Sequence, residues 1–319
     1  MTTSEPKPKP QGSKGHPGRI VLRIASLFAG AGAMGWLIGV VWPEPDQVAG
    51  GISPTLDNPA SLAPFPKAPV TVLLVGIDSD RVGDRNNGAA PQGLANADAV
   101  MLVRIDASRQ LEILQIPTEL AVQSPGADVP ISLASLWQAG GTGLLRDAIA
   151  EIVGLEDSHP QRFAVMPRSA LRQVVDGLGS VDVVLSQSFD QQDLAQDYRV
   201  KLDAGRQSLN GSEAEQLVRY RQNSADNHNR RLRQQQLIRA VVGQIQASDG
   251  ISGLAGVLIG VSPLLDTNLT KGELLSLAAA VVASPKTVKI TQLSLADQAG
   301  DQSLRQLSPG QSPPLWPVF

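Results

Sequence analysis

Residues 70–80 read VTVLLVGIDSD and join an apolar run to two carboxylates at its end. The uninterrupted, β-branched run at 70–77 is typical of a strand that is buried in a sheet. Ligands of α/β sheets commonly bind just beyond the carboxyl ends of the strands. Asp78 and Asp80 follow the run directly, which makes them candidate site residues.

Helical and strand patterns alternate after this run. Strands are predicted at 99–105, 111–116, 181–185 and 287–293, and helices at 144–153, 169–177, 212–220, 230–246 and 274–282. Two helix starts carry a capping-box pattern, Ser212 with Glu215 and Thr270 with Glu273. Interleaved helices and strands favour one α/β domain at 70–296, with three α/β/α layers around a central mixed sheet.

A single membrane span is predicted on the amino-terminal side of this domain. Residues 24–42 form 19 positions without a charge, enough to cross about 30 Å of hydrocarbon. Lysines and arginines precede the run and acidic residues follow it, so the positive-inside rule places the domain outside the cytoplasmic membrane. A cleaved signal peptide is the alternative, but the run is long for one and lacks a clear cleavage site.

The remaining segments are predicted from composition. Residues 1–19 read as a disordered cytoplasmic tail, 20–42 as the transmembrane anchor and 43–69 as a proline-rich stalk. The polar, proline-rich segment 297–319 is expected to be a flexible tail. About 70 of the 319 residues therefore lie before the domain.

The composition excludes several kinds of site. The chain has no cysteine and only 3 histidines, which excludes thiolate chemistry and leaves little room for a multi-histidine metal site. Its net charge of −3 argues against nucleic acid as a partner. Arginine outnumbers lysine 19 to 8, and arginine is the better fork for phosphate and carboxylate.

Six of these arginines lie between positions 219 and 239. Arg219 and Arg221 end one predicted helix, while Arg230 and Arg233 begin the next, whose amino terminus itself favours anions. Arg230, Arg233 and Gln234 are three or four positions apart and can share a face. The cluster predicts a phosphate or pyrophosphate clamp; a solvated basic helix face is the alternative.

Carboxylates are predicted to face this clamp. If the strands at 70–77 and 99–105 are antiparallel neighbours, Asp78 and Asp98 come close together. Two carboxylates with phosphate oxygens form a hard oxygen site suited to Mg²⁺ or Mn²⁺. Turn and cap positions are the alternative role for these two residues.

Several motifs, taken in order, resemble the LytR-CpsA-Psr family of cell-envelope phosphotransferases. They follow the tail and span as LLVGIDSD (73–80), NAD (96–98), IPTE (116–119), GLGSVD (177–182), LNGSEA (209–214), VRYR (218–221) and NRRLRQQQ (229–236). The resemblance covers about 70–295. It implies transfer of a phosphate-linked glycopolymer from a polyprenyl pyrophosphate lipid to peptidoglycan, on the outer face of the membrane and with a divalent cation.

The resemblance also implies roles for individual residues. Asp78 and Asp98 match the acidic, metal-associated positions, and Arg219 and Arg221 match the R-x-R pair that holds the pyrophosphate. Arg230 and Gln234 match a later arginine and glutamine. Asp78, Asp98, Arg219 and Arg221 are therefore the candidate catalytic residues. Arg219, Arg221, Arg230, Arg233 and Gln234 are the candidate substrate-binding residues.

The chain departs from the family pattern at several positions. Thr118 stands in place of the arginine of a P-R-D motif, Asn96 in place of an arginine two before Asp98, and Asn227 in place of an acidic residue. Arg81 or Arg85, in an insert at 81–95, could supply a lost charge. These changes favour, as the rival to transfer, a binder of polyprenyl phosphates or anionic envelope polymers without turnover. A transcription attenuator, the role implied by older naming in the family, ranks behind both.

Overall fold

The computed structural model describes residues 62–84, 94–105, 110–124, 126, 128–155, 160–193, 198–223, 226–247, 251–285, 287–297 and 304–317. Among these residues no helix is both long enough and apolar enough to cross a membrane. The predicted span at 24–42, the predicted cytoplasmic tail and most of the predicted stalk lie outside them.

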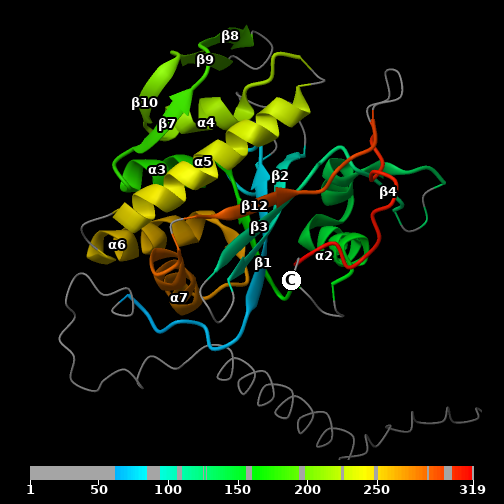
Figure 1. Cartoon of the computed structure of the whole chain (residues 1–319), viewed down its shortest axis with the longest axis horizontal. Coiled ribbons are helices and arrows are strands. Elements are labelled where there is room, and N and C mark those ends of the chain that lie inside the picture. The colour runs from blue at the N-terminus through cyan, green and yellow to red at the C-terminus, as the bar shows by residue number, and fades with distance from the viewer. Residues whose placement is uncertain are drawn as a thin grey trace, which may run out of the picture.

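A six-stranded mixed sheet forms the centre of the fold (Figure 1). Its order is β11 (Asp266–Thr267), β6 (Arg162–Met166), β1 (Val70–Ile77), β2 (Ala97–Ile105), β3 (Leu111–Ile116) and β12 (Lys289–Gln292). Strand β1 pairs antiparallel with β2 and parallel with β6, and β3 pairs antiparallel with β2 and parallel with β12. The expected mixed sheet is therefore confirmed, and β1 and β2 meet the condition of antiparallel neighbours on which the approach of Asp78 and Asp98 depended.

Helices cover both faces of this sheet, as the three-layer prediction requires. On one face, α2 (Leu133–Val153) packs Leu145 and Ile149 against Leu73 and Val75 of β1. On the other face, α5 (Asn227–Ala247) and α7 (Lys271–Val282) pack against Met101 of β2 and neighbouring strand residues. The alternation of β1 side chains between the two cores follows from the two-residue period of a strand.

A second core lies beside the sheet, under α5 (Figure 1). It joins α3 (Arg168–Gly177) and α4 (Gly211–Arg219) to two small sheets. The sheets are β7 (Val181–Leu185) with β10 (Gly205–Leu209), and β8 (Phe189–Asp193) with β9 (Tyr198–Leu202). The remaining elements are β4 (Ala121–Val122), β5 (Ile131–Ser132), α6 (Ile251–Val261) and a 3₁₀ turn at Ser262–Leu264.

Two predicted helix starts have different outcomes. The capping box of Thr270 and Glu273 at α7 is confirmed. At α4 the prediction was wrong, because Asn210 caps the helix with Glu213 as its partner, two positions before the expected pair. This leaves Glu215 free to face the interior. Helix α2 begins 11 residues before the expected 144, and its residue Gly141 has non-helical dihedrals at a kink.

The carboxyl-terminal segment is more ordered than expected. Trp316 is 2% exposed and belongs to the core beneath α2, and Leu120 and Leu295 form bridges with Arg305 and Leu307. The expectation of a flexible tail is therefore wrong for 304–317, because a buried indole holds the segment down. Similarly, the end of the predicted stalk packs on α7, where the Ser276 hydroxyl donates to the Pro64 carbonyl.

Candidate active site

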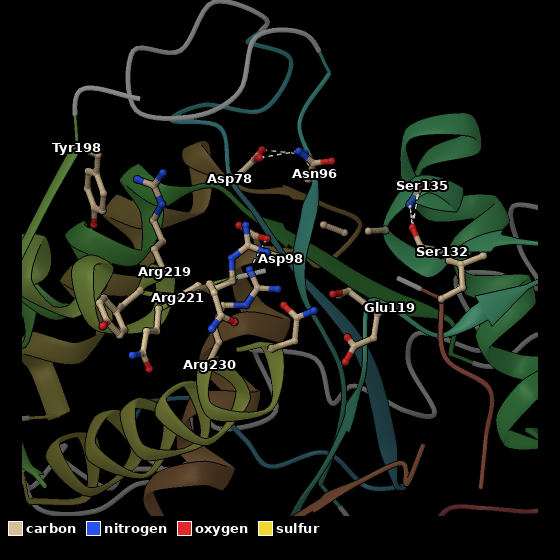
Figure 2. A pocket seen from close by; sticks show the side chains of 18 of the residues that line it. Asp78, Asn96, Asp98, Glu119, Ser132, Ser135, Tyr198, Arg219, Arg221 and Arg230 are labelled. Atoms are coloured by element: carbon tan, nitrogen blue, oxygen red, sulfur yellow. Dashed lines mark hydrogen bonds and ion pairs between the residues drawn. The ribbon is translucent and has the colours of Figure 1, made fainter. Parts of the chain in front are cut away.

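A cavity of about 760 Å³ opens where β1 ends and β2 begins. The end of β3, the start of α2, strand β9 and the loop between α4 and α5 complete its walls (Figure 2). Its polar lining includes Asp78, Asn96, Asp98, Thr118, Glu119, Ser132, Ser135, Tyr198, Arg219, Arg221, Asn227 and Arg230. The cavity thus brings five of the seven predicted site residues together; Arg233 and Gln234 are not part of its lining.

Asp78 and Asp98 lie at the same end of the β1–β2 pair, as predicted. The register shifts between Gly76 and Ile77, so Ile77 pairs with Ala97. Asn96 then binds both oxygens of Asp78, through its backbone N–H at 2.8 Å and its side-chain amide at 2.9 Å. Burial raises the pKa of Asp78, and the nearby Asp98 charge adds to this; the Asn96 hydrogen bonds offset part of the rise.

Arg230 and Gln234 fasten Asp98 from below. Nη1 of Arg230 lies 2.6 Å from Oδ1 of Asp98, and the arginine is 4% exposed. The Gln234 amide donates to the Asp98 carbonyl at 3.3 Å and accepts from Gln115 at 2.9 Å. Gln234 therefore supports the site from the interior without lining the cavity.

Arg219 and Arg221 enter the cavity from the end of α4 (Figure 2). The Arg219 guanidinium lies 4.1 Å from the ring centroid of Tyr198, a cation–π contact. Arg221 is exposed as a residue, yet protein atoms crowd its guanidinium, and this burial together with repulsion from Arg230 lowers its pKa. Within the described part of the chain, Arg221 forms no ion pair, which leaves its charge for a ligand.

Arg233 points elsewhere. It donates to the Tyr220 carbonyl and lies 3.1 Å from Asp226, with its guanidinium 4.9 Å from the Tyr220 ring centroid. These contacts tie α5 to the loop that carries Arg221. The expectation that Arg233 contacts substrate does not match its position outside the cavity lining, because its side chain binds Tyr220 and Asp226 instead.

A buried charged cluster beneath Arg219 was not predicted. Glu215, 4% exposed, accepts from Arg168 at 3.0 Å, from Arg219 at 2.9 Å and from Arg172, which also pairs with Asp80. Hydrogen bonds from Arg172 and Arg168 outweigh the effect of burial and lower the pKa of Glu215.

A close approach of two helices makes this cluster possible. A Cβ atom at Gly211 would lie 2.7 Å from the Cα atom of Arg172, so only glycine lets α4 pack this closely on α3. The sequence signals for this cluster were the LNGSEA motif and the arginines at positions 168 and 172. Neither signal by itself indicated that Glu215 would meet these arginines.

The departures from the family pattern have structural counterparts. Asn96 keeps Asp78 in place, and Glu119 is buried in an ion pair with Arg231. Thr118 and Asn227 line the cavity without charge. Of the two arginines suggested as substitutes, Arg81 is absent from the lining and Arg85 lies outside the described residues.

The predicted metal site contains two carboxylates, Asp78 and Asp98. The described residues contain no group of three or more His, Cys, Asp or Glu side chains that could hold a metal ion. Asp78 and Asp98 are nevertheless hard oxygen donors on one cavity wall, and Mg²⁺ commonly takes one or two carboxylates together with phosphate oxygens and water. The donor set therefore fits a cation that arrives with a phosphate ligand.

The protein therefore has an α/β/α fold with a cavity that is lined by arginines and carboxylates, an arrangement typical of a site for an anionic ligand. The chain belongs to the LytR_cpsA_psr family, whose pattern matches residues 55–309. The teichoic acid transferase TagU of Enterococcus faecalis is 24% identical over 213 residues, 66% of this chain and 65% of that protein. Biofilm regulatory protein A of Streptococcus mutans is 23% identical over 211 residues, 63% of this chain and 50% of that protein. The chain thus spans between half and two thirds of these curated relatives.

Solved structures share the fold. Bacillus subtilis TagV superposes with a TM-score of 0.62 at 19% identity, covering 76% of this chain and 91% of that one. A LytR-Csp2A-Psr enzyme from Actinomyces oris gives 0.59 at 17% identity, covering 75% and 86%. TagT bound to LI-WTA gives 0.56 at 23% identity, covering 76% and 84%.

Proposed function

We propose that this protein is a membrane-anchored, extracytoplasmic phosphotransferase. It moves a phosphate-linked glycopolymer from a polyprenyl pyrophosphate carrier to a peptidoglycan acceptor of the cell wall. The observation that carries the proposal is the meeting of Arg219, Arg221 and Arg230 with Asp78 and Asp98 in one cavity. Guanidinium groups bind phosphate oxygens through paired N–H donors, and a diphosphate needs several of them.

The relatives support this kind of chemistry. The E. faecalis relative is named a polyisoprenyl-teichoic acid–peptidoglycan teichoic acid transferase, and the TagT structure holds LI-WTA. Membrane anchoring rests on the apolar run at 24–42 and the charge difference across it. A single span with the amino terminus inside would place the domain at the outer surface of the plasma membrane.

We propose a role for each part of the cavity. Arg219 and Arg221 would hold the diphosphate and offset the charge that develops on the leaving lipid phosphate. An acceptor hydroxyl oxygen forms a bond to the phosphorus that carries the polymer, and the bond from that phosphorus to the bridging oxygen breaks. The polyprenyl monophosphate leaves with the bonding electron pair, and the hydroxyl proton passes to a carboxylate.

Asp78 is the better candidate for that base. Its raised pKa brings it closer to the working pH, whereas Asp98 is held in an ion pair by the Arg230 guanidinium. In the alternative role, Asp78 and Asp98 would together hold Mg²⁺ or Mn²⁺, and the cation would supply charge stabilisation to the phosphate oxygens. Asp98 and Arg230 would in either case fix the floor of the site.

A binder without turnover is the second candidate. Thr118 and Asn96 stand where arginines are expected, so the cavity holds less positive charge than the family pattern implies. The full chain in detergent, given a polyprenyl-pyrophosphate-linked glycan and Mg²⁺, separates the two. Release of polyprenyl phosphate supports transfer, whereas tight lipid binding without release supports the binder.

A further inference from the structure

The cavity has two chemically different halves (Figure 2). Tyr198, Arg219 and Arg221 form a cationic half. At the opposite end, next to the start of α2, Ser132 and Ser135 form a hydroxyl half together with Thr118, whose carbonyl accepts from Ala134. Glu119 lies between Asp98 and Ser132 in Figure 2. Asp78 and Asp98 lie between the two halves in Figure 2.

The hydroxyl half does not suit an anion, although a helix begins there. The first backbone N–H groups of α2 already have acceptors: Leu133 donates to the Leu120 carbonyl at 2.9 Å, and Ala134 donates to the Thr118 carbonyl at 3.1 Å. The backbone N–H of Ser135 donates to the Ser132 hydroxyl oxygen at 3.1 Å. A phosphate at this helix end would therefore lack the backbone donors that such sites use.

The neighbouring amide is also occupied. Asn96 gives its side-chain N–H to Asp78 at 2.9 Å, and its side-chain oxygen accepts from Gln138 at 2.7 Å. Arg231, a buried cation on α5, is paired with Glu119. Described residues of the hydroxyl half thus offer hydroxyl groups and one paired carboxylate.

Glu119 supplies the positive argument for a ligand. The residue is 9% exposed, and its Oε1 accepts from Arg231. Its Oε2 is buried and has no hydrogen-bond partner among the described residues. A buried acceptor of this kind needs a donor. An ionised phosphate oxygen cannot donate, whereas a sugar hydroxyl or an acetamido N–H can.

We infer that the hydroxyl half is the acceptor subsite and that it binds an uncharged, hydroxyl-bearing sugar of the wall, held by Glu119, Thr118 and Ser135. The assignment of this sugar as the acceptor rests on the proposed function. The assignment of a sugar-binding site rests only on the contacts described above. The arrangement places a neutral sugar on one side of Asp78 and the phosphate on the other. It predicts selectivity for a neutral acceptor over a polyanionic one.

Binding of two probes to the full chain in detergent tests the subsite. The probes are a neutral N-acetylhexosamine tetrasaccharide, followed by ligand-observed NMR, and inorganic pyrophosphate, followed by calorimetry. We expect both to bind at once. Thr118→Val with Ser135→Ala should weaken the saccharide at least tenfold and change the pyrophosphate affinity less than twofold. Ser212→Ala, an exposed serine on α4, is the matched control.

Two further single variants test the subsite if the double variant fails to fold. Ser135→Ala alone alters an exposed side chain, and Thr118→Arg should abolish saccharide binding while leaving or improving pyrophosphate binding. An unchanged saccharide affinity in Ser135→Ala and Thr118→Arg would overturn the inference. Displacement of the saccharide by pyrophosphate or by tripolyphosphate would overturn it as well, because it would show a single anionic site.

Turnover distinguishes failure of the subsite from failure of the proposed function. In the transfer assay, the double hydroxyl variant should raise the KM for acceptor without changing the KM for lipid donor. A wild-type protein that binds the saccharide but never releases polyprenyl phosphate would contradict transfer and leave the saccharide subsite intact. A protein that transfers normally with both hydroxyls removed would contradict the subsite alone.

Discussion

Glu215 and Arg219 lie one turn apart on α4, and Oε1 of Glu215 is 2.9 Å from Nη1 of Arg219. The same carboxylate binds Arg168 and Arg172 from α3, so one buried acid holds three arginines. Because the Tyr198 ring lies against Arg219, the guanidinium is fixed between an acid and an aromatic face. Arg219 therefore reaches the cavity in a preset orientation.

Replacing Glu215 with Gln should damage both stability and ligand binding. Removing one partner of a buried ion pair leaves uncompensated charge and costs about 3–5 kcal/mol. We expect urea unfolding to show a loss of this size, together with a higher KM for lipid donor. Asp190→Asn, which breaks the exposed pair with Arg199, is the control and should change neither quantity.

The pH dependence of stability gives a second readout of the same residue. The folded-state pKa of Glu215 lies below its ordinary value of 4.5, so the carboxylate stabilises the fold above that pH. This stabilisation should be lost as pH falls below about 4.5, and the loss should be smaller in Glu215→Gln. Equal acid sensitivity of the two proteins would contradict the cluster.

Arg221→Ala should separate binding from stability. Arg221 forms no ion pair within the described residues, so its removal should leave the melting temperature unchanged. Loss of a charge-assisted hydrogen bond costs about 1.5–3 kcal/mol, or roughly ten- to hundredfold in affinity for pyrophosphate. Calorimetry checks this, with Arg206→Ala as the control because Arg206 is exposed on β10. A large fall in melting temperature would show that Arg221 is structural.

Asp78 should set the acid limb of the pH–rate profile. A base must be deprotonated, so activity should fall as pH drops through the pKa of Asp78, which lies above the ordinary 3.8. Asp78→Asn should lower kcat by about 10²- to 10⁴-fold. Asn96→Ala removes the side-chain hydrogen bond to Asp78, which lowers this pKa, so it should move the limb to higher pH. Asp147→Asn, an exposed change on α2, serves as the control. An acid limb of the pH–rate profile that does not move in Asn96→Ala would exclude Asp78 as the residue that sets it.

Trp316→Ala should unfold the protein at lower urea. Burial of this indole beneath α2 anchors 304–317, and truncation of a buried aromatic costs about 3–5 kcal/mol. Val129→Ala, which is 66% exposed, should cost less than about 0.5 kcal/mol. Similar unfolding midpoints for both variants would mean that the segment is not part of the core.

Local patterns predicted most of the sheet and part of the site. The run at Val70–Ile77 is a central strand, and antiparallel pairing with β2 brings Asp78 and Asp98 to one edge. Local patterns gave the wrong prediction at the start of α4, where two overlapping capping boxes fit the sequence equally well. Asn210 with Glu213 and Ser212 with Glu215 both satisfy the capping-box spacing, and only packing against α3 decides between them.

The remaining errors involve contacts between distant segments. Spacing along α5 places Arg233 near Arg230, but Tyr220 and Asp226 draw it out of the cavity. The Glu215 cluster depends on how α3 meets α4, and the order of 304–317 depends on a single indole reaching the core. None of these contacts has a periodic pattern in the sequence that predicts it.

The most direct measurement is release of polyprenyl phosphate from a lipid-pyrophosphate-linked glycan by the full chain with Mg²⁺, compared with the double variant Arg219→Ala with Arg221→Ala. The proposed function predicts release and glycan transfer by the wild type, and loss of both lipid binding and transfer in the double variant. Circular dichroism should first show that the variant is folded, since Arg219 belongs to the Glu215 cluster. Undiminished transfer by the folded double variant would contradict the arginine clamp on which the proposed function depends.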